Sequence, residues 1–406
     1  MQKVLVIGYV WPEPNSSAAG SHMMSLLRLF NSQGWQVTFA SPAQRTEHMV
    51  DLAQEGIDSV TIALNCSSFD AFISELQPDM VMFDRFMMEE QFGWRVEKNC
   101  PNALRVLDTE DLQCLRQARH EAVKQQRAFS SSDLLSSELA KREIAAIYRS
   151  DLSLIISSYE IKLLAELFTL PETILHHLPF MVTPVEGEKK SFAQRAHFVS
   201  IGNFRHAPNW DAVLQLSQLW PHIRRQCPDA ELHIYGAYPP PKATALHNPK
   251  TGFLVKGWAD DAFDVMANAR VCLAPLRFGA GIKGKFIDAM QMGTPSVTTP
   301  IGVEGMTNGF PWPGAVAETE QAFIDAAVSL YQDSAKWQQA SEAGTQLLTQ
   351  VYDAQSLGAE LITRLYELQT NLTSHRQANF TGAMLRHHSM KSTQYMSQWI
   401  EAKNRS

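Results

Sequence analysis

The residues of this 406-residue chain that are best suited to chemistry are glycines and lysines between a predicted strand and a predicted helix. Their segment reads LRFGAGIKGKFIDAMQMGTPSVTTPIGVEG. Gly279, Gly281 and Gly284 allow a ligand to approach the backbone closely, and the helix that follows directs free N–H groups and about half a positive charge towards its amino end. Lys283 and Lys285 add two full charges. This combination predicts a phosphate-binding site.

Two familiar glycine patterns match this segment, and neither is decisive. Residues 279–285 satisfy the G-x-x-x-x-G-K part of a P-loop, but Phe286 stands where the magnesium-binding Ser or Thr is required. Residues 279–284 also satisfy G-x-G-x-x-G, with Glu304 twenty residues beyond, as in a dinucleotide site. That motif, however, follows about the fourth strand of its half of the chain, whereas a dinucleotide fingerprint follows the first.

Acidic residues follow another predicted strand, Leu104–Leu107, in the first half of the chain. They are Asp108, Glu110 and Asp111. A carboxylate at this position could accept or orient the proton of an acceptor hydroxyl. The same residues could simply cap the next helix, and for Asp111 the two interpretations have equal weight.

Metal, cofactor and hydrolase chemistry have little support in the sequence. It contains no Asp-x-Asp pair at the end of a predicted strand, no H-E-x-x-H and no G-x-S-x-G elbow. We therefore expect no metal ion and no cofactor, so that protein groups must meet the charge of any leaving group.

The elements around these motifs alternate between short β-branched runs and longer stretches of helical period. Each predicted strand is followed by a candidate helix. The predicted strands of the first half are Val4–Ile7, Val37–Ala40, Val60–Ala63, Met80–Phe83, Leu104–Leu107 and Leu154–Ile156, and those of the second are Phe198–Ile201, Leu232–Tyr235, Phe253–Val255, Val271–Ala274 and Ser296–Thr298. This order predicts an α/β fold of two Rossmann-like, doubly wound parallel sheets that face a cleft.

The domain boundary is predicted at a polar stretch, Thr183–Arg195, which has the composition of an exposed hinge. We expect an N-terminal domain over residues 1–185 and a C-terminal domain over residues 196–352. Residues 353–406 would then form a helix and a basic tail that pack back towards the N-terminal domain. The carboxyl ends of the strands would line the cleft, where such sheets bind ligands.

Composition and charge exclude several classes of protein. The 35 Lys and Arg against 42 Asp and Glu give a net charge of −7, which argues against a nucleic-acid coat. No apolar stretch approaches the ~18 residues that cross a bilayer, and the opening run Lys3–Trp11 is interpreted as a buried strand, not a signal peptide. Five cysteines, no two closer than 14 residues, fit a reducing cytoplasm.

Two basic segments leave a membrane contact open. Residues 371–406 carry five Lys and Arg against the single acid Glu401, which is typical of a solvated helix but also suits a membrane surface or an acidic partner. A stripe of four cations in the first half would suit a lipid-linked acceptor at the inner face of a membrane. The stripe consists of Arg116, Arg119, Lys124 and Arg127.

The run GAGIKGKFIDAMQMGTPSVTTPIGVEG resembles the donor-binding motif of the retaining GT-B-fold glycosyltransferases of family four, the group-one glycosyltransferases. FVSIGNFRHAPNWDAV and LHIYG are similar to the strands and glycine turns that precede that motif. GSHMMSLLRLFNSQGWQVTFASP resembles the family's first glycine loop and helix, and RVLDTEDLQCLRQARHE and SSYEIKLLAE resemble acceptor-side segments. The resemblance covers about residues 3–360.

This resemblance implies a donor site in the second half of the chain. Asp288 takes the place of the family's second conserved acid, which accepts from ribose hydroxyls, whereas the first acid, eight residues earlier, is here Ala280. Lys283 and Lys285 can meet at one diphosphate only if Lys283 precedes the regular helix, because the two side chains would otherwise point apart. The implied donor residues are Gly202, Asn203, Gly281, Ile282, Gly284, Asp288 and Glu304, with Arg205 as a further diphosphate ligand.

The acceptor side is implied less strongly, by Gly20, His22 and Asp111, with Asp108 as a candidate catalytic carboxylate. The expected reaction is a metal-independent, retaining transfer of a hexosyl group from a nucleotide diphosphate sugar to a glycan, lipid-linked or small-molecule acceptor. Lys283, Lys285 and Arg205 would stabilise the departing diphosphate. A nucleotide-sugar epimerase of the same fold and a non-catalytic nucleotide-sugar-binding protein remain as alternatives.

Overall fold

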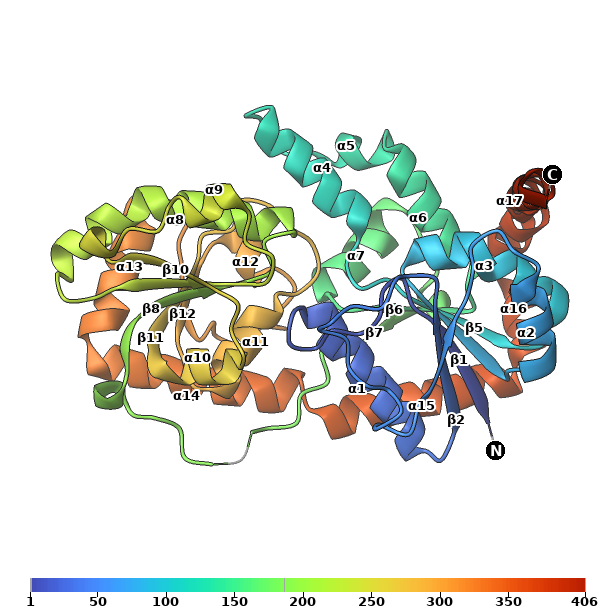
Figure 1. Cartoon of the computed structure of the whole chain (residues 1–406), viewed down its shortest axis with the longest axis horizontal. Helices are drawn as coiled ribbons and strands as arrows, with labels where there is room; N and C mark the ends of the chain where they lie inside the picture. The colour runs from blue at the N-terminus through green and yellow to red at the C-terminus, as the bar shows by residue number, and fades with distance from the viewer. Residues whose placement is uncertain (1, 186, 406) are drawn as a thin grey trace.

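The computed structural model describes residues 2–185 and 187–405, which form two α/β domains side by side (Figure 1). The first domain contains a seven-stranded parallel sheet in the order β3-β2-β1-β4-β5-β6-β7. Alternate residues of β1 enter separate apolar clusters on the two faces, as a sheet with helices on both sides requires. The strands are β1 (Lys3–Ile7), β2 (Gln36–Ser41), β3 (Asp58–Thr61), β4 (Met80–Asp84), β5 (Leu104–Asp108), β6 (Leu152–Ile155) and β7 (Leu175–His177).

The helices of the first domain follow its strands in βα order. Helix α1 begins after Ser17, whose side chain accepts a 3.1 Å hydrogen bond from the Gly20 N–H and so caps the helix. The helices are α1 (Ala18–Ser32), α2 (Ser68–Leu76), α3 (Phe86–Asn99), α4 (Gln113–Lys124), α5 (Ser131–Leu135), α6 (Glu138–Arg149), α7 (Ser158–Leu167) and the 3-10 turn η1 (Glu172–Ile174).

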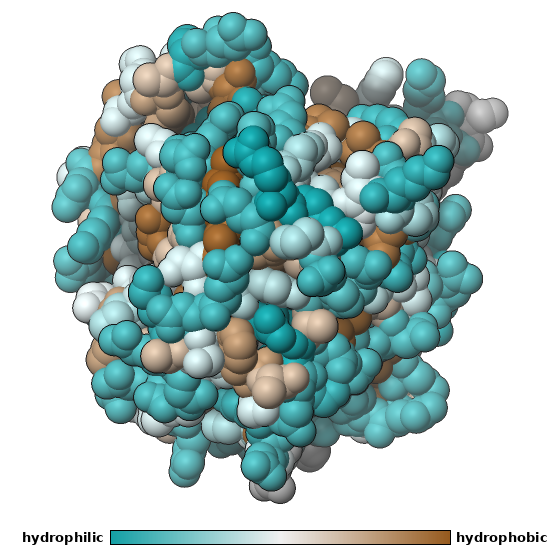
Figure 2. Space-filling view, turned by 90° about the vertical axis from the view of Figure 1, so that its left-hand side faces the viewer, coloured by the Kyte–Doolittle hydropathy of each residue, from teal (hydrophilic) through white to brown (hydrophobic). Residues whose placement is uncertain are grey.

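The second domain contains a six-stranded parallel sheet in the order β10-β9-β8-β11-β12-β13. Trp220 and Trp337 are almost fully buried in its core, while its outer end is largely hydrophilic with scattered apolar residues (Figure 2). The strands are β8 (Ala196–Ile201), β9 (Leu232–Tyr235), β10 (Phe253–Gly257), β11 (Ala269–Ala274), β12 (Ser296–Thr298) and β13 (Gly314–Val316).

The helices of this domain also follow its strands. They are α8 (Ala207–Gln226), α9 (Pro241–Thr244), α10 (Ala262–Asn268), α11 (Gly284–Gln291), α12 (Pro300–Val303), α13 (Glu320–Gln332) and α14 (Ser334–Val351), with 3-10 turns η2 (Phe192–Gln194) and η3 (Pro249–Thr251). Two parallel α/β sheets were predicted, and this prediction is confirmed. The edge strands β7 and β13 were not predicted, because their three residues, LHH and GAV, form no β-branched run such as the SVT of β12.

The C-terminal segment returns to the first domain. Helix α15 (Ala354–Thr370) contributes Leu361, Leu365 and Leu368 to the apolar cluster beneath the first sheet. Helices α16 (Leu372–Ala378) and α17 (Phe380–Arg405) follow, and α17 packs against α3 and α6. Among the described residues, no helix has an apolar stretch long enough to span a bilayer.

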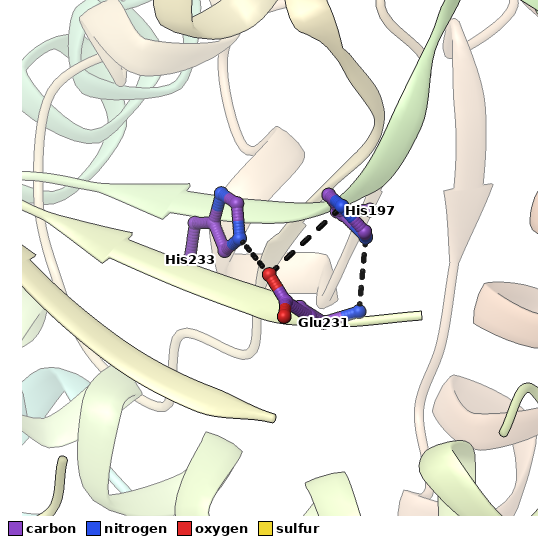
Figure 3. Close-up of side chains that lie close together, drawn as sticks. All are labelled: His197, Glu231 and His233. Carbon is purple, nitrogen blue, oxygen red and sulfur yellow. Dashed lines mark hydrogen bonds and ion pairs between the residues drawn. The ribbon is translucent and has the colours of Figure 1, made fainter. Parts of the chain in front are cut away.

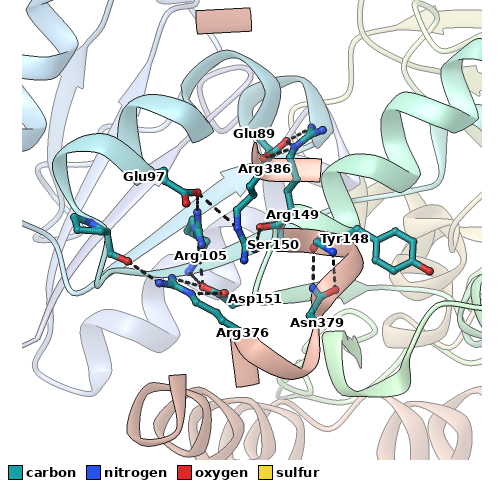
Figure 4. Close-up of polar contacts among 12 residues, drawn as sticks. Glu89, Glu97, Arg105, Tyr148, Arg149, Ser150, Asp151, Arg376, Asn379 and Arg386 are labelled. Carbon is teal, nitrogen blue, oxygen red and sulfur yellow. Dashed lines mark hydrogen bonds and ion pairs between the residues drawn. The ribbon is translucent and has the colours of Figure 1, made fainter. Parts of the chain in front are cut away.

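Two cations of the basic tail hold this segment in place (Figure 4). Arg376 donates to both carboxylate oxygens of Asp151 at 2.8 Å and to the carbonyl of Ala103 at 2.8 Å. Arg386 donates to the carbonyl of Arg149 at 3.2 Å. These two side chains therefore bind the first domain and are not part of a solvated face.

Candidate active site

A cavity of about 880 Å³ lies between the two domains. Its walls include residues that lie one or two positions beyond the carboxyl ends of strands of both sheets. These residues are Arg85 after β4, Glu110 after β5, Gly202 after β8, Gly236 after β9 and Leu276 after β11. The cavity is thus formed at the carboxyl ends of the strands, where doubly wound sheets bind their ligands.

Nine of the fourteen residues predicted for the site line this cavity. From the second domain they are Gly202, Asn203, Ile282, Lys283, Gly284, Lys285 and Asp288, and from the first His22 and Asp111. The other five make different contacts. They are Gly20, Asp108, Arg205, Gly281 and Glu304.

The two lysines converge on the amino end of α11. Lys283 is the N-cap residue with extended backbone angles (φ −108°, ψ 101°), so it precedes the regular helix as predicted. Its amine donates to the carbonyl of Gly281 at 2.8 Å, while that of Lys285 donates to the Asn209 side-chain oxygen at 2.9 Å. Burial lowers the pKa of each lysine to about 8. The positive charges of these two amines are only weakly offset by neighbouring negative groups, and both amines lie beside the amino end of α11. Together they form a site that can bind an anion.

Asp288 lies on the same helix and also lines the cavity. Burial, and then the negative charge of Asp261, raises the pKa of this carboxyl to about 7. A hydroxyl donor at this position would stabilise the carboxylate form, which is what a ribose hydroxyl would do.

Glycines after β8 and β9 bring two turns together at the cavity wall. A Cβ atom on Gly202 would lie 2.6 Å from the side-chain carbon of Asn209, and one on Gly236 would lie 2.1 Å from the carbonyl oxygen of Gly202. Neither position has room for a side chain. Asn209 is held between the two by a 3.0 Å hydrogen bond to the carbonyl of Asn203.

Arg205 does not reach the cavity, contrary to the prediction. It is exposed, and its guanidinium stacks 3.5 Å from the centre of the Tyr238 ring. The turn after β8 directs it outwards, and Asn209 and Lys285 occupy the place beside the glycines.

Glu304 also departs from its predicted donor-binding role, because it forms a two-pronged ion pair with Arg119 of the first domain. Nη1 and Nη2 of Arg119 donate to Oε2 and Oε1 of Glu304 at 2.6 and 2.8 Å. Gly281 faces the first domain as well. Its backbone has φ 61°, and a Cβ atom there would lie 2.8 Å from the Cβ of Asp111.

His22 is one of several polar residues of α1 that line the cavity. It is buried, and its Nε2 lies 3.6 Å from Oδ1 of Asp108. Burial opposes a charge on this ring, but the carboxylates of Asp108, Glu110 and Asp84 outweigh burial and raise the pKa of His22 to about 9. His22 is therefore an imidazolium at neutral pH.

Asp108 and Gly20 lie behind the wall, which corrects both predictions. Asp108 is fully buried, so it can act on a ligand only through His22. Gly20 faces the loop before α1, where a Cβ atom would lie 2.4 Å from the carbonyl oxygen of Glu13. Its role is close packing of that loop.

Asp111 lines the cavity but does not cap α4, whose N-cap is Leu112 without a side-chain bond. Its carboxylate pairs with Arg116 at 2.5 Å. The other cations of the predicted stripe are paired with acids too. The pairs are Arg119 with Glu304, Lys124 with Glu121 and Arg127 with Asp133. The stripe is therefore no uncompensated basic surface.

The sequence reasoning missed Arg85 as a residue of the wall, whereas it named Glu110 among the acids after the predicted strand Leu104–Leu107. Both have left-handed backbone angles that non-glycine residues rarely adopt, with φ 68° and 59°. Burial, together with the charge of Asp108, raises the pKa of Glu110 to about 8. Polar residues directly after two adjacent buried strands were the signal that pointed to them. Strained polar residues at a cavity wall are typical of a functional site.

Asp84, Asp108 and Glu110 bring carboxylate oxygens within 4.8 Å of one another, a spacing that could hold a metal ion. Two cations already face this cluster. Arg85 lies 3.7 Å from Asp84 and His22 lies 3.6 Å from Asp108. The carboxyl groups of this cluster therefore already have cationic neighbours at the wall.

A second group of possible metal ligands, His197, Glu231 and His233, lies near the amino ends of β8 and β9 (Figure 3). His233 donates to Glu231 at 2.7 Å, and Nδ1 of His197 accepts from the Glu231 N–H at 3.2 Å. A neutral His197 ring then carries its proton on Nε2, the atom that would have to bind a metal. The three residues satisfy one another without an ion.

Comparison with known proteins agrees with this geometry. Residues 195–333 match the protein family described as Glycosyl transferases group 1. Among curated proteins no sequence matches the chain.

Solved structures share the fold over most of the chain. Sucrose-phosphate synthase from Thermosynechococcus elongatus is 13% identical with a TM-score of 0.65, covering 91% of this chain and 99% of its own. A TarM variant from S. aureus, in a complex that includes UDP, is 10% identical with a TM-score of 0.67 over 91% and 100%. HepE from Anabaena, with UDP and glucose, is 14% identical with a TM-score of 0.64 over 91% and 100%. The chain thus has the GT-B fold of glycosyltransferases, and its second domain matches the group 1 glycosyl transferases.

Proposed function

We propose that the protein is a retaining glycosyltransferase that moves a hexosyl group from a nucleotide diphosphate sugar to a hydroxyl acceptor. The observation that carries this proposal is the pair Lys283 and Lys285 at the amino end of α11, inside a cavity between two GT-B domains. The proposal needs no metal ion and no cofactor, because these cations supply the charge that a leaving diphosphate requires.

The proposed reaction breaks the bond between the anomeric carbon and the diphosphate oxygen and forms a bond to the acceptor oxygen. The acceptor proton leaves with the diphosphate. The main barrier is charge separation, so preorganised donors at the diphosphate contribute most to the rate. In this proposal Lys283, Lys285 and the free N–H groups of α11 carry this task, and Asp288 binds the ribose.

The first domain faces the acceptor in this proposal. His22 carries a positive charge held by Asp108, Arg85 and Asp111 add charged groups to the same wall, and Glu110 adds a carboxyl group whose pKa is raised to about 8. This wall can bind the hydroxyls of a glycan or small molecule and can also meet a phosphate of a lipid-linked acceptor.

The exposed apolar side chains on the outer face of α17 support a cytoplasmic protein that binds the inner face of a membrane. Tyr395, Met396 and Trp399 are each more than half exposed there, and Lys403 lies 5.3 Å from the Trp399 ring. Sedimentation with vesicles of anionic lipid should carry the protein down, and Trp399→Ala should weaken this binding. Equal sedimentation with neutral and anionic vesicles would count against it.

The test of the proposed function is a panel of nucleotide diphosphate sugars, with UDP-sugars first because the TarM and HepE structures contain UDP. A donor at 100 times its dissociation constant should stabilise the protein by ~2.7 kcal/mol in a thermal shift. Release of nucleoside diphosphate from that donor, slow with water and fast with an acceptor, would support transfer.

The same assay separates the alternatives. Conversion of the sugar nucleotide to its epimer without acceptor, seen by NMR, would identify an epimerase. Binding without release of nucleoside diphosphate would identify a non-catalytic binding protein. The match of residues 195–333 to glycosyl transferases favours transfer over both.

A further inference from the structure

The loop that precedes α11 belongs to the second domain, but residues of the first domain also hold it in place. We infer that Glu160 and Arg119 of the first domain are positioning residues that hold this donor loop, residues 279–284, in its binding conformation and keep the two domains together beside it. The inference rests on the proposed function for its catalytic consequence, but the contacts themselves do not depend on it.

Glu160 forms the central contact. It is fully buried, and its Oε1 accepts from the Gly281 N–H at 2.7 Å and from the Leu112 N–H at 3.2 Å. The first bond fixes the left-handed turn of the donor loop, and the second fixes the start of α4 beside Asp111. One carboxyl oxygen therefore joins the donor wall of the cavity to the acceptor wall.

Arg119 holds the other end of the loop. Its guanidinium donates to the carbonyl of Gly279 at 2.9 Å and to both oxygens of Glu304. It is buried and lies 5.2 Å from the Tyr159 ring, so its geometry is tightly restricted. Gly279 and Gly281 are thus bound to α4 and α7, two helices of the first domain, at points two residues apart.

Steric contacts show how closely the domains meet here. A Cβ atom on Gly284 would lie 2.4 Å from the Cβ of Ala18, and one on Gly305 would lie 2.0 Å from the hydroxyl oxygen of Ser157. The glycines of the motif therefore do two things. They open the backbone to an anion, and they let the first domain approach.

The same packing accounts for Ala280. Its side chain belongs to the apolar cluster of the first domain, with Leu112, Leu115 and Ile155. An acid at this position would bury a charge in that cluster, next to Gly281, where Glu160 already sits. The loop thus lacks the acid that the family resemblance implies, and a carboxyl group from the other domain holds it instead.

The first test needs no ligand. Small-angle scattering should show a larger radius of gyration for Glu160→Ala than for the unchanged protein. Glu160→Gln should match the unchanged protein, because its amide oxygen can accept from the same two N–H groups. Glu166→Ala, on the exposed side of the same helix, is the matched control. Identical scattering of Glu160→Ala and the unchanged protein would overturn the inference.

The second test measures function. Glu160→Ala should raise the donor KM and weaken UDP binding on the order of 10-fold or more, because two buried N–H groups lose their acceptor. Glu160→Gln should restore most of the UDP binding and the donor KM, whereas an equal loss of UDP binding in both variants would overturn the inference. If Glu160→Ala does not fold, Arg119→Ala takes its place, and a normal donor KM in that variant would also overturn it. Failure of the unchanged protein to bind any nucleoside diphosphate would refute the proposed function alone, since scattering still tests whether the two domains stay together.

Discussion

Lys285 allows the sharpest separation of a catalytic role from a structural one. Among the residues that the structure describes, no carboxylate forms an ion pair with it, and its amine donates only to the side-chain oxygen of Asn209. Burial lowers its pKa from 10.5 to about 8. At ~1.4 kcal/mol per unit, a charged Lys285 costs the ligand-free protein on the order of 3 kcal/mol, an upper value because the cavity admits solvent.

The sign of this cost follows from the direction of the shift. The unfolded chain binds the proton more tightly than the folded protein, so the cost is fully present below pH 8 and disappears as the pH rises towards 10.5. Lys285→Met removes the charge and keeps most of the side-chain volume. The thermal midpoint should therefore stay unchanged or rise, and its increase between pH 8 and 10 should become smaller.

Activity should respond in the opposite direction. Loss of one preorganised donor at the leaving group typically costs ~10²-fold in turnover, so kcat of Lys285→Met should fall by about this factor with a donor that the unchanged protein uses. Calorimetry at several pH values and initial rates of nucleoside diphosphate release measure the two effects. Lys162→Met, on the exposed side of α7, is the control. A variant of Lys285 that unfolds earlier yet transfers sugar normally would refute the reasoning.

Four further predictions concern the walls of the cavity. Asp288→Asn should weaken UDP binding, and in the unchanged protein this binding should weaken as the pH falls below about 7, because protonation removes the acceptor for ribose hydroxyls; a flat profile in isothermal titration would contradict this. Asp108→Asn should remove the stability that the raised pKa of His22 supplies. This stabilisation is fully present below pH 6.5 and is lost as the pH rises through about 9. Denaturant titrations of the variant and the unchanged protein should therefore differ most at low pH. Gly284→Ala should lower kcat/KM by more than 10-fold, because its methyl group would collide with Ala18 at the domain interface; normal kinetics would show that the interface can open without loss. Arg205→Ala should change the donor KM less than 3-fold, since the Arg205 side chain stacks on Tyr238 outside the cavity. A large rise in the donor KM would instead indicate that Arg205 binds the diphosphate.

Much of the fold could be predicted because its evidence is local. Buried parallel strands have continuous apolar runs, and helices have a 3.6-residue period, so both sheets were visible in short windows of sequence. The anion site was equally local, because Gly279, Gly284 and the two lysines lie within seven residues and act through one helix terminus. The short strands β7 and β13 lacked the β-branched residues that made the equally short β12 visible.

Pairings between distant residues could not be predicted. Glu304 was implied as a donor residue by the family resemblance, yet it pairs with Arg119, 185 positions away. Glu160 and Gly281 are 121 positions apart. Asp108 was placed correctly at a strand end, but only the fold shows that His22 lies between it and the cavity.

The sequence by itself determined two α/β units and a glycine- and lysine-rich loop at a helix terminus, because backbone conformation and N–H direction follow from residues a few positions apart. The tertiary structure decided which side chains face the cavity and which domain holds the loop. Those outcomes depend on how two separately folded sheets are oriented, and hydrogen bonds between Glu160, Arg119 and the loop exist only at that orientation.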